Sequence, residues 1–339
     1  PRGEALVSGS SLYFNVPEWA GKDLERVRST LFEPLPPSLR TLLDDRDMLL
    51  PAGEGDPLRP FLVLLAARSM GCSGERVVRL AAGVQMIHLA SLLHDRLGAV
   101  SGGGVSGEQA ERDHHQKEAM DILLGDFMFS RASCIIIEDG EERIVRDMIQ
   151  TSIASAEVQA TLVSLEKNPE TYQPSRCFDT VAEKLSLLLS LGLRVGAMLG
   201  KASDAEMEAL SEFGALFGRG LRIVRDLECW QGSAVGVSPQ PGEVRYHHPL
   251  LLLWEQEGKE AWEDAVREVR HSGGPPPEDL RSRVEGAGYI RSSLSESRRY
   301  AEEAVSRLER QPGLRGTADL NGLVLDVFFR EGGREGEEA

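Results

Sequence analysis

The chain has 339 residues, of which 41% are hydrophobic, and this is enough for the core of one large domain or two ordinary ones. Its 38 basic and 54 acidic residues give a net charge of −16, which argues against nucleic acid or an anionic membrane as a partner. The four cysteines form no CxxC pair, so the sequence favours a reducing cytoplasm over a disulfide framework. The longest uncharged apolar run, at 185–193, is too short for a membrane span.

Apolar residues recur at helical spacing along the chain, and alternating runs typical of strands are nearly absent. Helix-start and helix-stop residues divide this pattern: Pro57 and Pro60 lie near one start, Gly71 follows one end, and Ser203 and Asp204 precede another helix. We therefore predict an all-α fold. The predicted helices are 20–32, 58–70, 75–97, 109–137, 142–166, 178–200, 204–230, 247–257, 260–271, 277–285, 289–310 and 317–329.

Two segments, 77–93 and 185–199, are apolar almost all the way round, which is typical of interior helices covered by an outer shell of amphipathic ones. The chain shows no internal repeat and no composition break. We predict one domain over residues 1–330, followed by a flexible acidic tail at 331–339.

A polar face interrupts the apolar helix predicted at 75–97. His88, Ser91 and Asp95 follow helical spacing, so His88 and Asp95 lie on the same side, about 10 Å apart. Buried ionisable groups need partners, so this face is expected to border a cavity. The alternative is that His88 is a satisfied core histidine and Asp95 only a helix-end carboxylate.

Charged residues also break the apolar pattern where the predicted helix 204–230 ends, at Arg222, Arg225, Asp226 and Glu228. Alone, they indicate a salt-bridged surface cap. Lys184 enters another apolar helix, and its ammonium is expected to reach solvent unless an anion lies beside it.

Taken together, these segments resemble the trans-isoprenyl diphosphate synthases, or polyprenyl synthetases, from about residue 20 to residue 330. The resemblance is carried in order by PLRPFLVLLAAR at 57–68, VQMIHLASLLHD at 84–95, LLGDFMFSRA at 123–132, AEKLSLLLSLGLRVGAML at 182–199, LRIVRDLECW at 221–230 and RYHHPLLLL at 245–253. It implies the isoprenoid synthase fold, a bundle of long helices around a deep central cavity, usually in a homodimer. In that family, two DDxxD motifs hold Mg²⁺ ions that bridge an allylic diphosphate, which isopentenyl diphosphate then attacks.

Both aspartate-rich motifs are incomplete in this chain. The first, at 94–99, keeps only its first aspartate, and the second, at 225–229, keeps only its second. The residual metal candidates are Asp95, Asp226 and Glu228. The substituted motif positions are Arg96, Ala99, Arg225 and Cys229. Asp56 stands where the family has the lysine that grips isopentenyl diphosphate.

The resemblance also implies which residues would bind diphosphate: Arg59, His88, Lys184 and Arg245. Arg96 and Arg225 would repel a metal ion. We hypothesise that Arg225 pairs with Asp95, and Arg96 with Asp226, which would close the mouth of the site without metal.

Two isolated carboxylates cannot hold a cluster of Mg²⁺ ions, because each ion needs one or two carboxylates besides phosphate oxygens and water. We interpret the chain as a family member that is not a competent chain-elongating synthase but a non-catalytic subunit or a prenyl or diphosphate-binding homologue, in a homodimer or a heteromer with an active synthase subunit. Such a protein needs no cofactor. The alternative is an active prenyltransferase that condenses isopentenyl diphosphate with an allylic diphosphate, with Mg²⁺ in a reduced site. A generic helical interaction protein is the third interpretation.

Overall fold

The computed structural model describes residues 14–32, 57–95, 108–167, 173–230, 247–272, 276–311 and 314–329. Its helices are α1 (Glu18–Phe32), α3 (Leu58–Ser69), α4 (Glu75–Asp95), α5 (Glu108–Asp139), α6 (Glu142–Lys167), α7 (Pro174–Leu199), α8 (Asp204–Trp230), α9 (His248–Glu257), α10 (Lys259–Ser272), α11 (Glu278–Gly286), α12 (Tyr289–Glu309) and α13 (Thr317–Phe328). The predicted all-α fold is confirmed. The predicted acidic tail at 331–339 lies outside the described residues.

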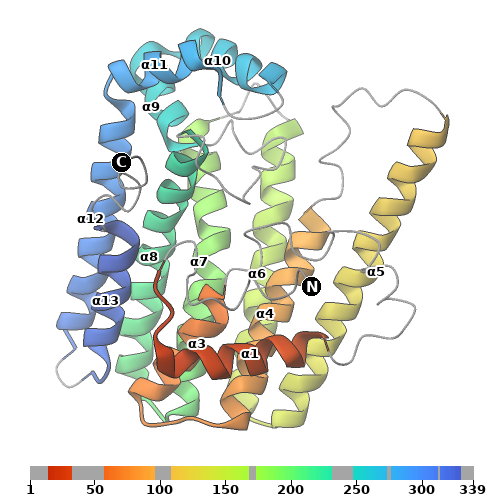
Figure 1. The fold of residues 1–339 in the computed structure, drawn as a ribbon, viewed down its shortest axis with the longest axis vertical. Helices are drawn as coiled ribbons and strands as arrows, with labels where there is room; N and C mark the ends of the chain where they lie inside the picture. The colour runs from red at the N-terminus through yellow and green to blue at the C-terminus, as the bar shows by residue number, and fades with distance from the viewer. Residues whose placement is uncertain are drawn as a thin grey trace, which may run out of the picture.

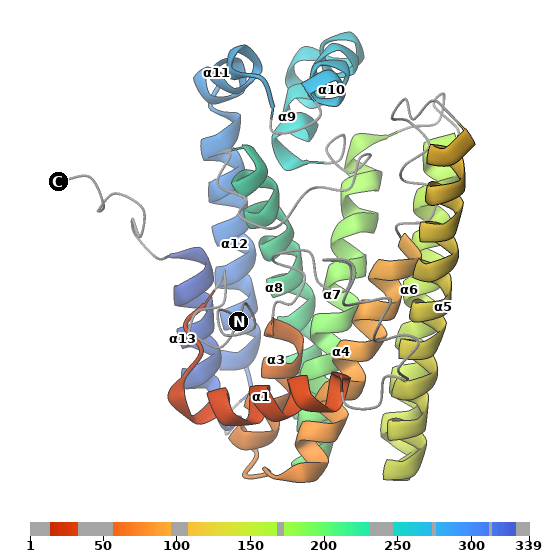
Figure 2. The same cartoon turned by 45° about the vertical axis from the view of Figure 1, so that its right-hand side comes forward.

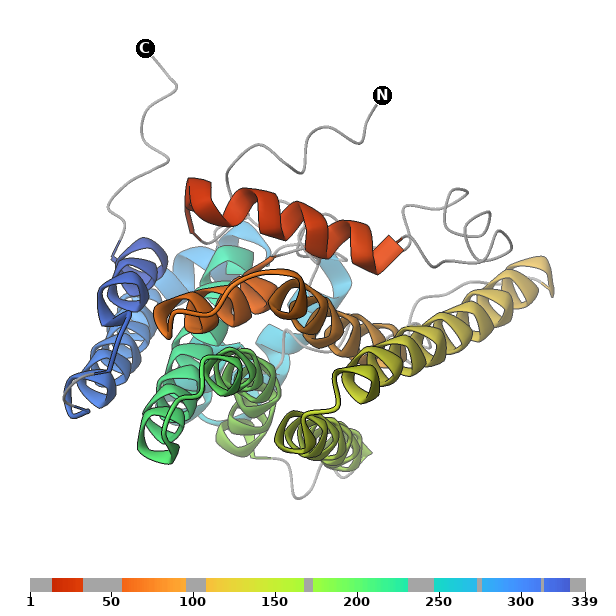
Figure 3. The same ribbon diagram turned by 90° about the horizontal axis from the view of Figure 1, so that it is seen from below.

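The long helices form a bundle with α7 in its interior (Figure 1). Helix α7 packs against α3, α6 and α8, and α8 packs in turn against α12. Helix α1 crosses α3 and α4 on one side of the bundle (Figure 3). Helices α9, α10 and α11 gather at one end, toward which α4 and α8 both run (Figures 1 and 2).

The interior helices are those with apolar residues on every side. Most residues of α3, α4 and α7 are buried, which confirms the interior position expected for 77–93 and 185–199. Within the described part of the chain, α4 alone is long and apolar enough to cross a membrane, but 78% of that apolar window is buried inside the protein.

Small residues let α7 approach two neighbours closely. A Cβ atom at Gly196 would lie 2.4 Å from the carbonyl oxygen of Val63 on α3, so glycine is required for this approach. On another side of α7, Ser190 donates a hydrogen bond of 3.0 Å to the carbonyl oxygen of Ser211, beside Gly214 of α8. These contacts fix α7, and the charged groups it carries, relative to α3 and α8.

The predicted helix boundaries agree with the structure to within a few residues. The largest difference is at α7, which begins at Pro174 rather than at the predicted residue 178. Proline is well tolerated in the first helical turn because its missing N–H would have no intrahelical partner there. Gln173, just before it, has extended backbone, and this places the start of the helix.

Candidate functional site

Asp95 ends α4, and its carboxylate forms an ion pair with the ammonium group of Lys184 on α7. Lys184 also donates a hydrogen bond of 2.7 Å to Oε1 of Gln159 on α6. The side chains of Lys184 and Asp95 are only 16% and 10% exposed, so Lys184 does not extend into solvent. The anion that lies beside this lysine is Asp95 itself.

Asp226, on the last turns of α8, is a buried residue that joins α8 to α9. Its Oδ1 lies 2.8 Å from Nε of Arg222, one helical turn earlier, and its Oδ2 accepts a hydrogen bond of 2.9 Å from the backbone N–H of His248. That N–H belongs to the first residue of α9, where a negative charge is favoured by the unpaired amides and the helix dipole. The interpretation of this helix end as a surface cap is therefore wrong for Asp226, which is 1% exposed.

His88 lies among three cations that come from three other helices. Burial lowers the pKa of His88 well below its usual value, and the positive charges of Arg59, Arg225 and Lys184 lower it further. Arg59 is on α3, Lys184 on α7 and Arg225 on α8. Three of the residues singled out in the sequence thus act on one buried imidazole, which stays neutral at physiological pH.

The described residues do not fit a cluster of Mg²⁺ ions. Magnesium is held by carboxylate oxygens, phosphate oxygens and water. Nowhere in the described ranges do three or more His, Cys, Asp or Glu side chains stand in a group that could hold a metal ion. The carboxylates of Asp95 and Asp226 already face Lys184 and Arg222. We therefore derive no chemical step through a metal.

An anion fits this arrangement better than a cation. Arginine and lysine side chains held in place by a folded framework bind phosphate oxygens with short, charge-assisted hydrogen bonds. A neutral histidine adds one donor or acceptor, depending on its tautomer. The buried position of Arg59, which is 2% exposed, strengthens the electrostatic attraction for an anion because few water molecules screen it.

The remaining predicted site residues are placed as follows. Glu228 and Arg225 are half-buried on α8, and Cys229 is buried beside them. Asp56, Arg96, Ala99 and Arg245 lie outside the described residues. The hypothesis that Arg225 pairs with Asp95, and Arg96 with Asp226, stays a prediction.

Two contributors to the site are not predicted from the sequence pattern: Gln159 and His248. Arg222 and Asp226 are four residues apart on one helix, and this spacing is a signal for an ion pair. The contacts of Gln159 and His248 depend on how separate helices pack, for which the sequence alone has no comparable signal.

The chain matches the family model for polyprenyl synthetases over residues 48–228, which is more than half of its length. It belongs to the polyprenyl synthetase family. Among curated relatives, it is 24% identical to the octaprenyl diphosphate synthase of Haemophilus influenzae over 258 residues, covering 75% of this chain and 77% of that enzyme. It is 31% identical to the geranylgeranyl diphosphate synthase of Methanosarcina mazei over 189 residues, covering 53% of this chain and 56% of that enzyme.

Solved structures of polyprenyl synthetases share the fold. The polyprenyl synthase of Caulobacter crescentus, in complex with calcium and isoprenyl diphosphate, superimposes with a TM-score of 0.74 at 23% identity, covering 93% of this chain and 96% of that one. The decaprenyl diphosphate synthase of Rhodobacter capsulatus gives a TM-score of 0.71 at 23% identity, covering 91% and 96%. The predicted isoprenoid synthase fold is confirmed.

Proposed function

We propose that this polyprenyl synthetase family member binds a prenyl diphosphate through fixed cations and does not elongate it. The observation that carries the proposal is the gathering of Arg59, Lys184 and Arg225 around His88. A diphosphate in that position would be neutralised by side chains that are part of the fold. The ligand class is supported by the Caulobacter crescentus relative, whose crystals hold isoprenyl diphosphate.

The ion pair between Asp95 and Lys184 argues against a role for Asp95 in metal binding. A Mg²⁺ ion that used this carboxylate would have to displace the ammonium of Lys184 from a site where both side chains are largely buried. Arg225 stands where the second DDxxD motif would begin, and its charge repels a divalent cation. On this basis both motifs are degraded, and the metal-dependent reaction of the family is lost.

A protein of this kind would act as a subunit or as a binding protein in isoprenoid biosynthesis, either as a homodimer or as the partner of an active synthase. The four cysteines, Cys72, Cys134, Cys177 and Cys229, are free thiols in the structure. Free thiols support a location in the reducing cytoplasm.

A second candidate function is prenyl transfer in a reduced metal site with Asp95, Asp226 and Glu228 as ligands. It is favoured by the names of the relatives, which are octaprenyl and geranylgeranyl diphosphate synthases. In this case Mg²⁺ would be the cofactor, and isopentenyl diphosphate would be condensed with an allylic diphosphate.

A direct assay separates these two functions. The full chain is incubated with isopentenyl diphosphate, allylic diphosphates of several lengths and Mg²⁺, and the products are extracted and sized. An active octaprenyl diphosphate synthase serves as the positive control. We expect no extended product. Turnover by the wild-type chain that is lost in Asp95→Ala would establish the second function instead.

A further inference from the structure

Two acid–base pairs join α7 to its neighbours at two levels of the bundle. Arg194 pairs with Asp147 of α6, and Lys184 pairs with Asp95 of α4. The side chains of the first pair are 20% and 18% exposed, and those of the second are 16% and 10% exposed. Arg194 comes ten residues after Lys184, about 15 Å further along the helix. Burial is therefore similar in the two pairs, and what distinguishes them is the set of groups around each.

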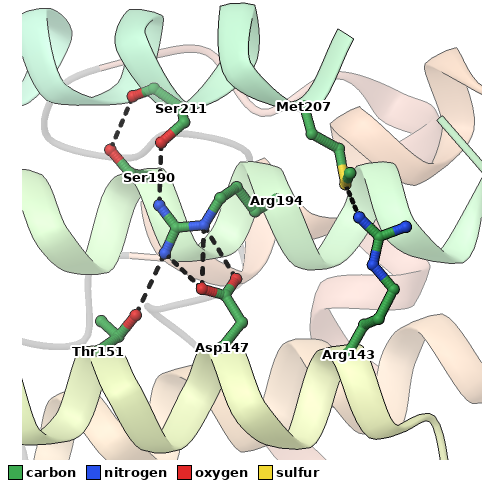
Figure 4. A network of polar contacts seen from close by, with 7 residues as sticks. All are labelled: Arg143, Asp147, Thr151, Ser190, Arg194, Met207 and Ser211. Carbon is green, nitrogen blue, oxygen red and sulfur yellow. Dashed lines mark hydrogen bonds and ion pairs between the residues drawn. The ribbon is translucent and has the colours of Figure 1, made fainter. Parts of the chain in front are cut away.

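The pair of Arg194 is a structural tie. Nε of Arg194 lies 2.9 Å from Oδ2 of Asp147, and Nη2 lies 3.0 Å from Oδ1 of the same carboxylate (Figure 4). Nη1 donates to the hydroxyl of Ser211 at 3.0 Å, and Nη2 also donates to the hydroxyl of Thr151 at 3.2 Å. Every nitrogen of this guanidinium thus has a partner within the fold, and the contacts hold α6, α7 and α8 together.

The pair of Lys184 has different surroundings. An ammonium group has three N–H donors, and Asp95 and Gln159 accept from Lys184. The charge of Lys184 acts on His88 together with the charges of Arg59 and Arg225. The carboxylate of Asp95 is therefore an anion beside one member of a group of cations that come from three helices.

The position of Asp95 on its own helix does not favour an acid. Asp95 is the last residue of α4. At this end of a helix the last carbonyl groups have no intrahelical partners and the helix dipole is negative, so a cation is favoured and an anion is disfavoured. The negative charge of Asp95 is stabilised by Lys184 of α7 rather than by α4 itself.

A carboxylate and a phosphate compete for the same ammonium group, because both accept charge-assisted hydrogen bonds from lysine. A diphosphate that reached Lys184 while Asp95 stayed in place would bring two anions together where little water screens them. The ligand must therefore displace Asp95 from Lys184 or bind against its charge, and both lower the affinity.

We propose that Asp95 is an internal competitor of the diphosphate: its carboxylate occupies the ammonium of Lys184 in the free protein and lowers the affinity for the ligand. This inference rests on the proposed function, which assigns Lys184 to the diphosphate site. It gives Asp95 the opposite role to that of a metal ligand. Removal of its charge should tighten binding, whereas removal of a metal-binding carboxylate should weaken it.

The test is calorimetric titration of geranyl diphosphate into the full chain in EDTA, with wild type and Asp95→Asn compared. Asparagine has the size of aspartate, and its amide oxygen can still accept a hydrogen bond from Lys184. We expect the dissociation constant to fall about 10-fold, because one repulsive charge is removed from the site. Asp95→Glu, which keeps the charge, should bind no more tightly than wild type.

Asp147→Asn is the matched control, because it removes the acid of the other α7 pair and changes the net charge by the same amount. It should leave the affinity unchanged. Asp179→Asn, at the surface partner of Arg219, is a second control in case Asp147→Asn loses helical content by circular dichroism. Asp95→Ser is a second uncharged variant in case Asp95→Asn does so.

Three results would overturn the inference. Binding by wild type that is equally tight or weaker in Asp95→Asn would overturn it and leave the proposed function standing. The same tightening in a control variant would assign the effect to net charge. If neither wild type nor Asp95→Asn bound geranyl diphosphate, the proposed function itself would fall, and the inference with it.

Discussion

Lys184 of α7 and Asp95 of α4 form an ion pair at the end of α4, with both side chains largely withdrawn from solvent. Asp95 is the one aspartate of the first motif that remains in this chain. Its partner is one of the three cations around His88. Asp95, which is expected to bind a metal, is therefore paired with Lys184, which is expected to bind diphosphate.

Replacing Lys184 by methionine should lower the free energy of unfolding by about 2 kcal/mol, because it leaves a mostly buried carboxylate without its cation. Urea denaturation followed by circular dichroism measures the change. The control is the double variant Lys184→Met/Asp95→Asn, in which no charge is left unpaired. It should recover most of the loss, and a double variant as unstable as the single one would show that the pair does not contribute in this way.

Replacing Arg225 by glutamine should weaken the binding of a prenyl diphosphate in the presence of EDTA about 10-fold, since one charge-assisted contact is removed. Arg219 is the matched control: it is on the same helix and pairs with Asp179 at 3.2 Å on the surface, so Arg219→Gln should leave affinity unchanged. Arg225→Gln should also raise the pKa of His88, which NMR titration of the imidazole measures. Equal effects of the two substitutions on affinity would mean that only net charge matters.

The stability of the protein should fall as the pH is lowered from 6.5 to about 4. Burial lowers the pKa of His248 to about 4, so in this range the unfolded chain binds a proton that the folded chain does not. The share of His248 in the free energy of unfolding, about 3 kcal/mol, is complete above pH 6.5 and lost by pH 4. The fully buried His247, whose pKa is also lowered by burial, acts in the same direction.

The variant His248→Phe tests this assignment. The ring of His248 packs edge-on to Phe178, with centroids 5.1 Å apart, and its Nδ1 is hydrogen-bonded to Ser293 at 2.9 Å. Phenylalanine keeps the ring and removes the titration, so the slope of stability against pH between 6.5 and 4 should become smaller. An unchanged slope would assign the pH dependence to other groups.

Gly196→Ala should destabilise the protein by about 1–3 kcal/mol or more, because the added methyl group would lie 2.4 Å from the carbonyl oxygen of Val63 and would force α3 and α7 apart. Gly322→Ala in α13 is the control. No atom lies within 4 Å of its added methyl group, so the substitution should stabilise the helix by about 0.5–1 kcal/mol. Thermal unfolding measures the loss of stability expected for Gly196→Ala and the gain expected for Gly322→Ala.

The fold could be predicted from the sequence because helix boundaries depend on local features. Each of these features lies within one or two helical turns of the position that it predicts: the periodicity of α4, the glycine after α3 and the serine before α8. The family resemblance then supplied the arrangement of the helices. Pro174 is a local signal for the start of α7, but it precedes the apolar pattern on which the predicted helix rests.

The partners in the site could not be predicted in the same way. Lys184 and Asp95 are 89 residues apart, and their contact depends on the packing of α4 near α7. The bond between Asp226 and the backbone of His248 likewise depends on where α9 begins relative to α8.

Calorimetric titration of geranyl diphosphate into the full chain, once with EDTA and once with Mg²⁺, tests the central claim most directly. If Arg59, Lys184 and Arg225 neutralise the diphosphate, binding occurs in EDTA and Mg²⁺ changes the affinity little. Binding that requires Mg²⁺, and that is lost in Asp95→Ala, would contradict the claim and would show that the remaining carboxylates hold metal.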